Sequence, residues 1–341
     1  MLKIDISSLP LLYEKIATFY PLVLPIKKAN EVNYDKYSNG AEVSLFTLKT
    51  NKSPKDMFFP QTEDLMKFKV DGQKIEIIDT RKEAQPFVVM GVKACDYKAF
   101  EVLDRVFLVD PIDTYYKTKR EAGIIITLAC DRPEESCFCK AFNIDASSPL
   151  GDITTWKVDD KLFWKANTQK GKDLTEKVKD LFTEGDEKAV EKAKQEITET
   201  ISKLPFSNID VNALSKDEML DTFKSDKWSK LSEACLGCGT CTFVCPTCQC
   251  FDIREFNAND KIMRFRCWDS CMYKDFTKTA GGQPRPTQMQ RFRQRFMHKL
   301  VYYPENNDGL YSCVGCGRCV KKCPSHLNIV KVIKAFGGEK K

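Results

Sequence analysis

The sequence contains only two histidines, His298 and His326, among 341 residues. We expect both to pack in the interior or lie at the surface rather than to bind a metal. The chain also lacks the G-x-G-x-x-G dinucleotide fingerprint, the phosphate-binding P-loop and the H-E-x-x-H zinc motif. The sequence therefore shows no site of its own for NAD(P), FAD or nucleotide hydrolysis, and no candidate catalytic residue.

Long apolar runs are absent as well. No stretch approaches the ~18 consecutive apolar residues of a membrane-spanning helix. The first twenty residues include acidic side chains and lack the continuous apolar segment of a secretory signal peptide. With 42% hydrophobic and 30% charged residues, the composition is that of a globular protein. We expect a reducing, cytoplasmic location rather than a secreted disulfide scaffold.

Positive charge is concentrated toward the end of the chain. Residues 261–341 hold 17 Lys and Arg against 5 Asp and Glu, whereas residues 1–260 hold 37 against 43. We interpret this excess mainly as compensation for nearby negative charge, and also as a docking surface for an acidic partner. The residues concerned are Arg264, Arg266, Arg285, Arg291, Arg293, Arg295 and Lys299. Nucleic-acid binding is the alternative, but no recognised nucleic-acid module accompanies these residues.

Cysteine is abundant, with sixteen residues, and eight of them form two runs of identical spacing, C-x2-C-x2-C-x3-C-P. This is the ligand spacing of bacterial ferredoxins, in which the fourth cysteine of each run binds the other cluster. We therefore predict two [4Fe-4S] clusters. The first is assigned to Cys235, Cys238, Cys241 and Cys323, and the second to Cys313, Cys316, Cys319 and Cys245. Structural zinc is the alternative, although zinc sites normally use two separated C-x2-C pairs or include histidine.

The other eight cysteines form two further groups. Between the two motifs lie Cys248, Cys250, Cys267 and Cys271, for which we predict a third cluster. Nearer the N-terminus lie Cys95, Cys130, Cys137 and Cys139, which are candidates for a fourth. Cys95 and Cys130 follow two predicted buried strands, and ligands collect at strand ends in α/β folds. The alternative for both groups is that they are free buried thiols.

Hydrophobic patterning divides the chain into three parts. Residues 1–142 are predicted to form an α/β domain, with an N-terminal helix at 1–20, strands at 43–48, 75–78, 87–90 and 124–128, and helices at 64–68 and 96–106. Residues 143–215 are predicted to be a charged connector, with a hairpin at 153–166 and helices at 174–182 and 187–204. Residues 216–341 are predicted to be a mainly α-helical, ferredoxin-like two-cluster domain with a cysteine-rich insertion. A helix at 216–234 leads into its first motif.

The motifs together resemble a known family. They are CLGCGTCTFVCPTCQCFD, RCWDSCMYKDFTKTAGG and CVGCGRCVKKCP near the C-terminus, with GVKACDYKAFEVLDRVF and DTYYKTKREAGIIITLACDRPEESCFC before them. The chain resembles the iron–sulfur beta subunit of cytoplasmic NiFe hydrogenases, or sulfhydrogenases, and is similar to the A subunit of anaerobic sulfite reductase. The resemblance covers most of the chain except residues 145–215. It implies an electron-relay subunit that works beside a flavoprotein subunit handling NAD(P)H and, in some members, beside a catalytic metal subunit.

Three functions are compatible with these observations. The leading hypothesis is an electron-transfer component of a hydrogenase-, sulfite-reductase- or bifurcating-type complex, rather than a stand-alone enzyme. Its clusters would relay single electrons between an NAD(P)H/flavin subunit and a terminal catalytic subunit or ferredoxin. A second hypothesis makes the N-terminal cysteine group a substrate-binding cluster. A third, based only on the basic excess, is a nucleic-acid-binding iron–sulfur protein.

Overall fold

The computed structural model describes residues 1–47, 49–81, 85–214, 219–258 and 261–337. Its body is built on a sheet of eight strands in the order β10-β1-β9-β8-β7-β6-β2-β3. The strands are β1 (Leu2–Asp5), β2 (Leu22–Lys28), β3 (Glu31–Lys36), β6 (Phe87–Val92), β7 (Gly123–Leu128), β8 (Ile153–Val158), β9 (Lys161–Ala166) and β10 (Thr183–Glu184). The central strands β2, β6, β7 and β8 run parallel, and the strands outside them pair antiparallel. The apolar sequence of β7 agrees with burial on both faces, as expected for a central parallel strand.

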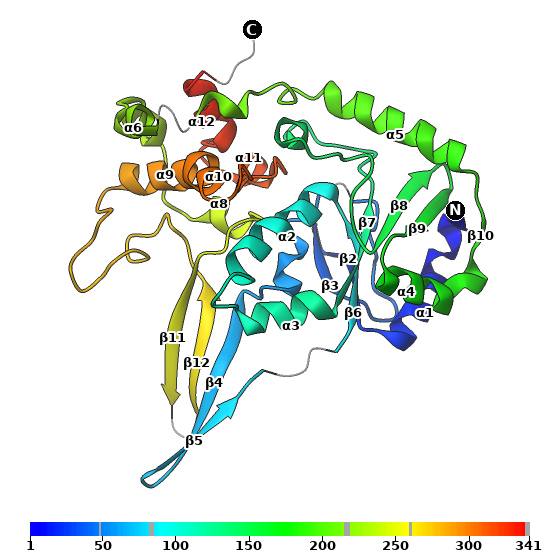
Figure 1. The fold of residues 1–341 in the computed structure, drawn as a ribbon, viewed down its shortest axis with the longest axis horizontal. Helices are drawn as coiled ribbons and strands as arrows, with labels where there is room; N and C mark the ends of the chain where they lie inside the picture. The colour runs from blue at the N-terminus through cyan, green and yellow to red at the C-terminus, as the bar shows by residue number, and fades with distance from the viewer. Residues whose placement is uncertain (48, 82–84, 215–218, 259–260, 338–341) are drawn as a thin grey trace.

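Helices cover both faces of this sheet (Figure 1). On one face, α1 (Leu9–Phe19) and α4 (Gln169–Val178) pack their apolar sides against alternate strand residues such as Met90 and Ile126. On the other face lie α2 (Ala94–Phe107), α3 (Thr114–Ala122) and α5 (Glu187–Ser202). Cys95 and Cys130, which follow β6 and β7, line one cavity together with Cys316, so the carboxyl ends of these strands lie against the C-terminal part of the chain.

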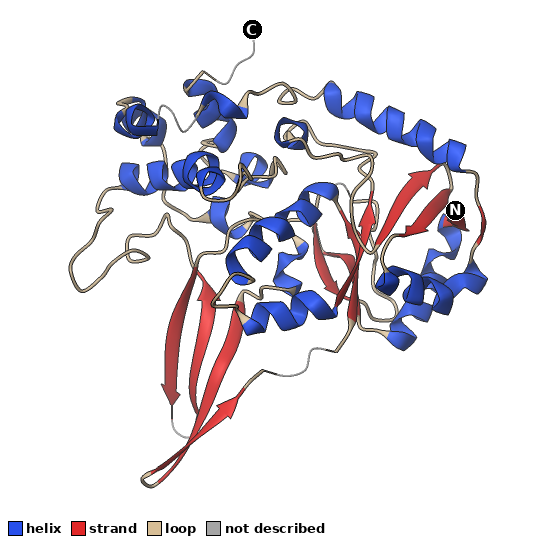
Figure 2. Ribbon diagram, in the orientation of Figure 1, coloured by secondary structure: helices blue, strands red, loops and turns tan. Residues whose placement is uncertain are grey.

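A second sheet projects from the body as a finger (Figures 1 and 2). It has the order β11-β12-β4-β5 and combines two hairpins that are far apart in the sequence. The strands are β4 (Thr62–Asp71), β5 (Lys74–Asp79), β11 (Phe251–Ala258) and β12 (Lys261–Trp268). The central pairing joins β12 to β4, with Cys267 opposite Thr62. The cysteine-rich insertion therefore contains a β-hairpin and is anchored to the N-terminal region.

The C-terminal region is mainly helical and has its own apolar core. Its helices are α6 (Met219–Lys224), α7 (Lys227–Ser232), α8 (Thr240–Phe243), α9 (Gln288–Met297), α10 (Tyr303–Glu305), α11 (Arg318–Lys322) and α12 (Ile329–Ala335), with a π-helical segment, His298–Tyr302, after α9. Short 3-10 helices occupy Ile6–Ser8, Pro54–Met57, Cys139–Phe142, Lys179–Leu181 and Val211–Ala213. The core packs Trp228, Phe292, Phe296, Leu300 and Ile333 together.

A buried ion pair joins the C-terminal region to the body. Both Nη atoms of Arg318 bind the Asp96 carboxylate, at 2.5 and 2.7 Å, and the two side chains are 3% and 1% exposed. Arg318 Nε also donates to the Thr50 carbonyl at 3.0 Å. Because Asp96 follows Cys95 and Arg318 precedes Cys319, this contact fixes the two cysteine-bearing segments against each other.

Several predicted elements are confirmed. The strands at 75–78, 87–90 and 124–128 correspond to β5, β6 and β7, and the helices at 96–106 and 187–204 correspond to α2 and α5. The helix predicted at 174–182 begins earlier, as α4, and ends at Val178, with a 3-10 turn after it. The hairpin at 153–166 is present as β8 and β9. It lies within the large sheet, between β7 and β1, so this sheet continues beyond residue 142. The three-part division of the chain into domains stays a prediction.

Other predicted elements are wrong. Residues 64–68 lie in strand β4 rather than in a helix, because pairing with the distant β12 overrides the local pattern. Residues 43–47 form a loop with one isolated bridge, Val43 to Ile26, and Leu48 lies outside the described residues. The helix predicted at 1–20 is preceded by strand β1, so only α1 is α-helical over its length. The single helix predicted at 216–234 is instead two short helices, α6 and α7, and residues 215–218 lie outside the described ranges. No helix in the described ranges is long and apolar enough to cross a membrane.

Candidate metal centres

The first predicted thiol group surrounds a small cavity in the C-terminal region. Cys235, Cys238, Cys241 and Cys323 all line it. Gly239 has φ 73°, and a Cβ there would lie 2.5 Å from the Tyr273 hydroxyl oxygen, so a larger residue would be both strained and crowded. Gln288 Nε2 donates to the Cys235 sulfur at 3.4 Å. The loop thus holds the thiols around a space with a hydrogen-bond donor at one sulfur.

The second predicted thiol group surrounds a neighbouring cavity. Its walls include Cys245, Cys313, Cys316 and Cys319. Each cavity therefore receives its fourth thiol from the other motif, which is the crossed arrangement that the sequence predicts. Gly317, with φ 73°, precedes α11 as Gly239 precedes α8, so the two motifs repeat the same local structure. A Cβ at Gly315 would collide with the Phe138 carbonyl, so this loop is pressed against the body.

The four N-terminal cysteines also meet around one cavity. Cys95 stands near the start of α2 after β6, Cys130 follows β7, and Cys137 and Cys139 come from the next loop. The carboxyl ends of two adjacent parallel strands thus supply half of the group, as expected for α/β folds. Gly315 and Cys316 line this cavity too, and Phe138 N donates to the Gly315 carbonyl at 2.8 Å. This cavity therefore lies directly against the second one.

The insertion brings three of its four cysteines together. Cys250 and Cys271 share a hydrogen bond that lowers the pKa of Cys271 to about 6 and raises the pKa of Cys250. Cys248 accepts a hydrogen bond from Arg295 Nη1 at 3.4 Å. Cys267 is apart from them. It lies in β12 between the buried Arg266 and Trp268, and strand alternation turns it to the opposite face of the sheet.

Buried cations stand among these thiols. Arg295 and Lys299 are 2% and 4% exposed. Lys299 Nζ donates to Thr247 Oγ1 at 2.8 Å and to the Ser312 carbonyl at 2.7 Å. Burial acts to lower the pKa of Lys299, but the thiols of Cys245 and Cys248 outweigh it and raise the pKa above its usual value. The buried cations thus stabilise negative charge on the sulfurs.

Lys55 is a site residue that sequence reasoning missed. Its Nζ donates to the Cys248 carbonyl at 2.7 Å and lies 3.9 Å from the centre of the Trp268 ring. Lys55 is 3% exposed, and burial lowers its pKa. Nothing in the local sequence marks this lysine, because its partners follow about two hundred residues later.

Charge compensation by the basic C-terminal residues applies to fewer of them than predicted. Arg295 and Lys299 line thiol cavities. Arg266 instead pairs with Glu63 and Asp113, and Arg264 pairs with Glu255. Arg291 donates to backbone carbonyls, among them that of Met272, and Arg293 stacks on Phe223. The interpretation is therefore wrong for Arg264 and Arg266, whose charges are neutralised by carboxylates. For Arg285, Arg291 and Arg293 it stays a prediction.

The two histidines fit the packing and surface roles expected of them. His298 packs its ring against Tyr303, with 5.9 Å between the ring centres. Burial, reinforced by the nearby Lys299 and Arg295, lowers the pKa of His298 to about 4. His326 is exposed.

The donor sets fit iron–sulfur clusters. Both cavities of the dicluster domain are lined by four cysteines, and the N-terminal cavity is lined by its own four together with the shared Cys316. A single zinc ion, with Zn–S bonds of about 2.3 Å, needs its ligands gathered around one point. A [4Fe-4S] cluster spreads them over four irons and so needs thiols around a space. In the described ranges, no three His, Cys, Asp or Glu side chains are arranged to hold one ion.

Comparison with known proteins defines the class. Residues 234–327 match the family model of the 4Fe-4S dicluster domain. The C-terminal region is therefore a dicluster domain, which supports the two predicted [4Fe-4S] clusters.

A relative extends the match to almost the whole chain. The protein is 33% identical over 316 residues to the sulfhydrogenase 2 subunit beta of Pyrococcus furiosus, and the alignment covers 91% of this chain and 90% of that protein. The chain belongs to this family of sulfhydrogenase beta subunits, as the motifs indicated. No solved structure matches it significantly.

Proposed function

We propose that the protein is the electron-relay subunit of a hydrogenase-type complex. The observation that carries this proposal is that the thiol cavities share walls. Cys316 lines both the N-terminal cavity and its neighbour, and Arg295 lines both cavities of the dicluster domain. Clusters held in adjoining cavities can exchange electrons without movement of the protein.

The relay would use four clusters. Two occupy the cavities of the dicluster domain, and one occupies the cavity of Cys95, Cys130, Cys137 and Cys139. Another rests on Cys248, Cys250 and Cys271, without Cys267. The four N-terminal thiols can bind every iron of a [4Fe-4S] cluster, which favours a relay role for this cluster over substrate binding. The three-thiol group leaves one iron for another ligand. When bound, each cluster supplies one-electron redox chemistry, and the chain's residues hold and insulate it.

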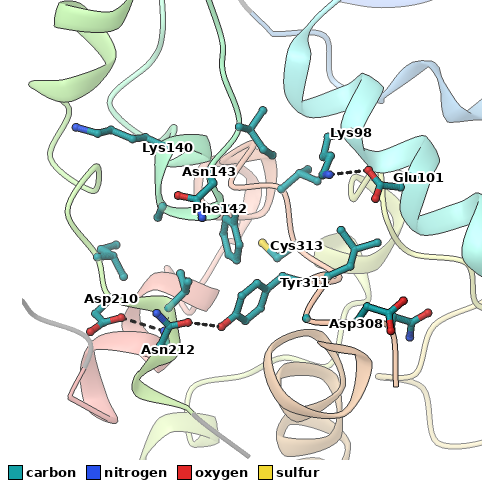
Figure 3. Close-up of a pocket in the computed structure, with 18 of the residues that line it drawn as sticks. Lys98, Glu101, Lys140, Phe142, Asn143, Asp210, Asn212, Asp308, Tyr311 and Cys313 are labelled. Atoms are coloured by element: carbon teal, nitrogen blue, oxygen red, sulfur yellow. Dashed lines mark hydrogen bonds and ion pairs between the residues drawn. The ribbon is translucent and has the colours of Figure 1, made fainter. Parts of the chain in front are cut away.

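A wide groove gives the relay a contact with the outside (Figure 3). It has a volume of about 580 Å³, and Cys313 forms part of its wall. Cys313 also lines the second thiol cavity, so one sulfur separates the groove from the cluster proposed there. Ion pairs at the groove, Lys98 with Glu101 at 2.6 Å and Arg105 with Asp308 at 2.7 Å, cancel most of its charge.

The partners follow from the family. The relative is named as a subunit of a sulfhydrogenase, which supports a multi-subunit complex for this chain as well. We propose that one partner is a flavin subunit that binds NAD(P)H, since the present sequence shows no site for either cofactor. The other would be a terminal catalytic metal subunit or a ferredoxin. The groove beside Cys313 is the contact that we assign to one of them.

The test is anaerobic purification of the intact chain, followed by iron and sulfide analysis and EPR of the reduced protein. Two clusters contribute about 8 irons and four contribute about 16. We expect more than 8 irons and several [4Fe-4S] signals. A preparation that contains only zinc would contradict the proposal. Copurification of a flavin-containing subunit from the native source would identify the electron donor.

A further inference from the structure

Arg295 occupies a position that no other described cation shares. It lies on α9 and lines both thiol cavities of the dicluster domain. It is 2% exposed, so its charge is screened very little by solvent. The same guanidinium therefore acts on both predicted ferredoxin-type clusters.

The contacts of Arg295 are made to the cluster-binding segments. Its Nη2 donates to the Cys241 carbonyl. Its Nη1 donates to Thr242 Oγ1 at 3.2 Å and to the Cys248 sulfur at 3.4 Å. Its Nε is buried and has no hydrogen-bond partner among the described residues. This remaining donor is available to a sulfur of a bound cluster.

The counter-charge of Arg295 differs from that of Arg318, the other buried arginine nearby. Arg318 is neutralised by Asp96. Within the described ranges, Arg295 forms no ion pair with a carboxylate, and the groups that raise its pKa against the effect of burial are the thiols of Cys241, Cys248, Cys271 and Cys245. A buried cation without a counter-ion is costly, so thiolates and clusters must balance this one.

We propose that Arg295 sets the reduction potentials of the two ferredoxin-type clusters jointly. Each cluster gains one negative charge on reduction, and a buried positive charge beside both stabilises the reduced form of both. Because the same cation serves the two clusters, its charge raises both potentials together. This inference rests on the proposed relay function.

Two neighbouring cations provide matched controls. Lys299 is equally buried but lines only the cavity of Cys245, Cys313, Cys316 and Cys319. Arg293 is on the same helix as Arg295, but it stacks on Phe223 at 3.6 Å and donates to the Phe223 carbonyl at 2.9 Å. The three residues thus differ in whether they face two thiol cavities, one or none.

The experiment is a redox titration of the iron-loaded full chain, monitored by EPR, with Arg295→Met, Lys299→Met and Arg293→Met. We expect Arg295→Met to move both ferredoxin-type clusters to more negative midpoint potentials. Lys299→Met should move only the cluster bound by Cys313, Cys316 and Cys319, and Arg293→Met should move neither. Unchanged potentials in an Arg295→Met protein with its full iron content would overturn the proposal.

A second pair of variants covers the case in which Arg295→Met does not load its clusters. Arg295→Lys keeps the charge, whereas Arg295→Gln keeps a polar side chain without it. Lysine should restore potentials near those of the parent protein, and glutamine should leave them more negative. Equal potentials in these two variants would overturn the role of the charge. If the unmodified parent protein showed no ferredoxin-type EPR signals, the relay function itself would be refuted.

Discussion

The interiors of the N-terminal body and the C-terminal dicluster domain are stabilised in different ways. The body buries hydrocarbon on both faces of a sheet, with residues such as Leu12, Met90 and Phe100 almost fully covered. The dicluster domain also has an apolar core, but beside it lie two cavities lined by thiols and the buried cations Arg295 and Lys299. Negative charge on the thiols is needed to balance those cations, so we expect the folding of the second region to depend more on iron than that of the first.

Removal of iron should produce the largest difference in stability between the two regions. In the apo-protein, the chain after about residue 235 should become sensitive to protease, while the sheet of the body stays resistant. The measurement is limited proteolysis under anaerobic conditions with identification of the fragments by mass spectrometry, and the iron-loaded chain is the control. Equal resistance along the apo-chain would show that the dicluster domain does not need its metal to fold.

Breaking the ion pair between the regions should have the next largest effect. Arg318→Met leaves the Asp96 carboxylate buried without a partner, which should cost about 3–5 kcal/mol in the free energy of unfolding. Urea unfolding of the iron-loaded protein measures it. Arg105→Met is the matched control, because its pair with Asp308 is exposed and should contribute about 0–1 kcal/mol. Similar losses of unfolding free energy in both variants would show that the buried Arg318–Asp96 pair does not stabilise the contact between the two regions.

The crossing of the fourth ligands can be tested within the dicluster domain. Cys245→Ser should damage the cluster of Cys313, Cys316 and Cys319 more than the cluster of Cys235, Cys238 and Cys241, since Cys245 lines the former cavity. EPR and iron analysis distinguish the two. Selective loss of the other cluster would show that the pairing is wrong.

The insertion should contribute a smaller, separable part of the iron. Replacing Cys250 and Cys271 together by Ala should remove about four irons while both ferredoxin-type signals survive, and should slow electron transfer through the complex. Cys267→Ala is the control and should remove none, because the charged neighbours of Cys267 are Asp252, Arg254 and Asp269 rather than the other thiols. An unchanged iron content in the double variant would mean that these cysteines are structural thiols.

The sequence was most informative where chemistry fixes the spacing. The interval between cysteines is dictated by cluster geometry, so the two motifs and their crossed fourth thiols could be predicted. The buried strands β6 and β7 were also predictable, because each is a short, continuous apolar run bounded by polar residues. In these cases, the signal lies within a few consecutive residues.

Contacts between distant segments were not predictable. Strand β4 owes its conformation to β12, which follows almost two hundred residues later, so its own residues suggested a helix. The same hairpin holds Cys267 within strand β12, opposite Asp252 and Thr62, although the four cysteines of the insertion appear equivalent in the sequence. The location of Lys55 beside Cys248 is likewise a product of the tertiary fold.

The most direct test of the account is whether the clusters are magnetic neighbours. EPR spectra of the fully reduced, iron-loaded chain should show broadened, rapidly relaxing signals, because clusters in adjoining cavities interact through their spins. The Arg318→Met variant, which lacks the ion pair between the two cysteine-bearing segments, provides the comparison. Spectra that are the simple sum of isolated cluster signals, in a protein with its full iron content, would contradict a continuous relay.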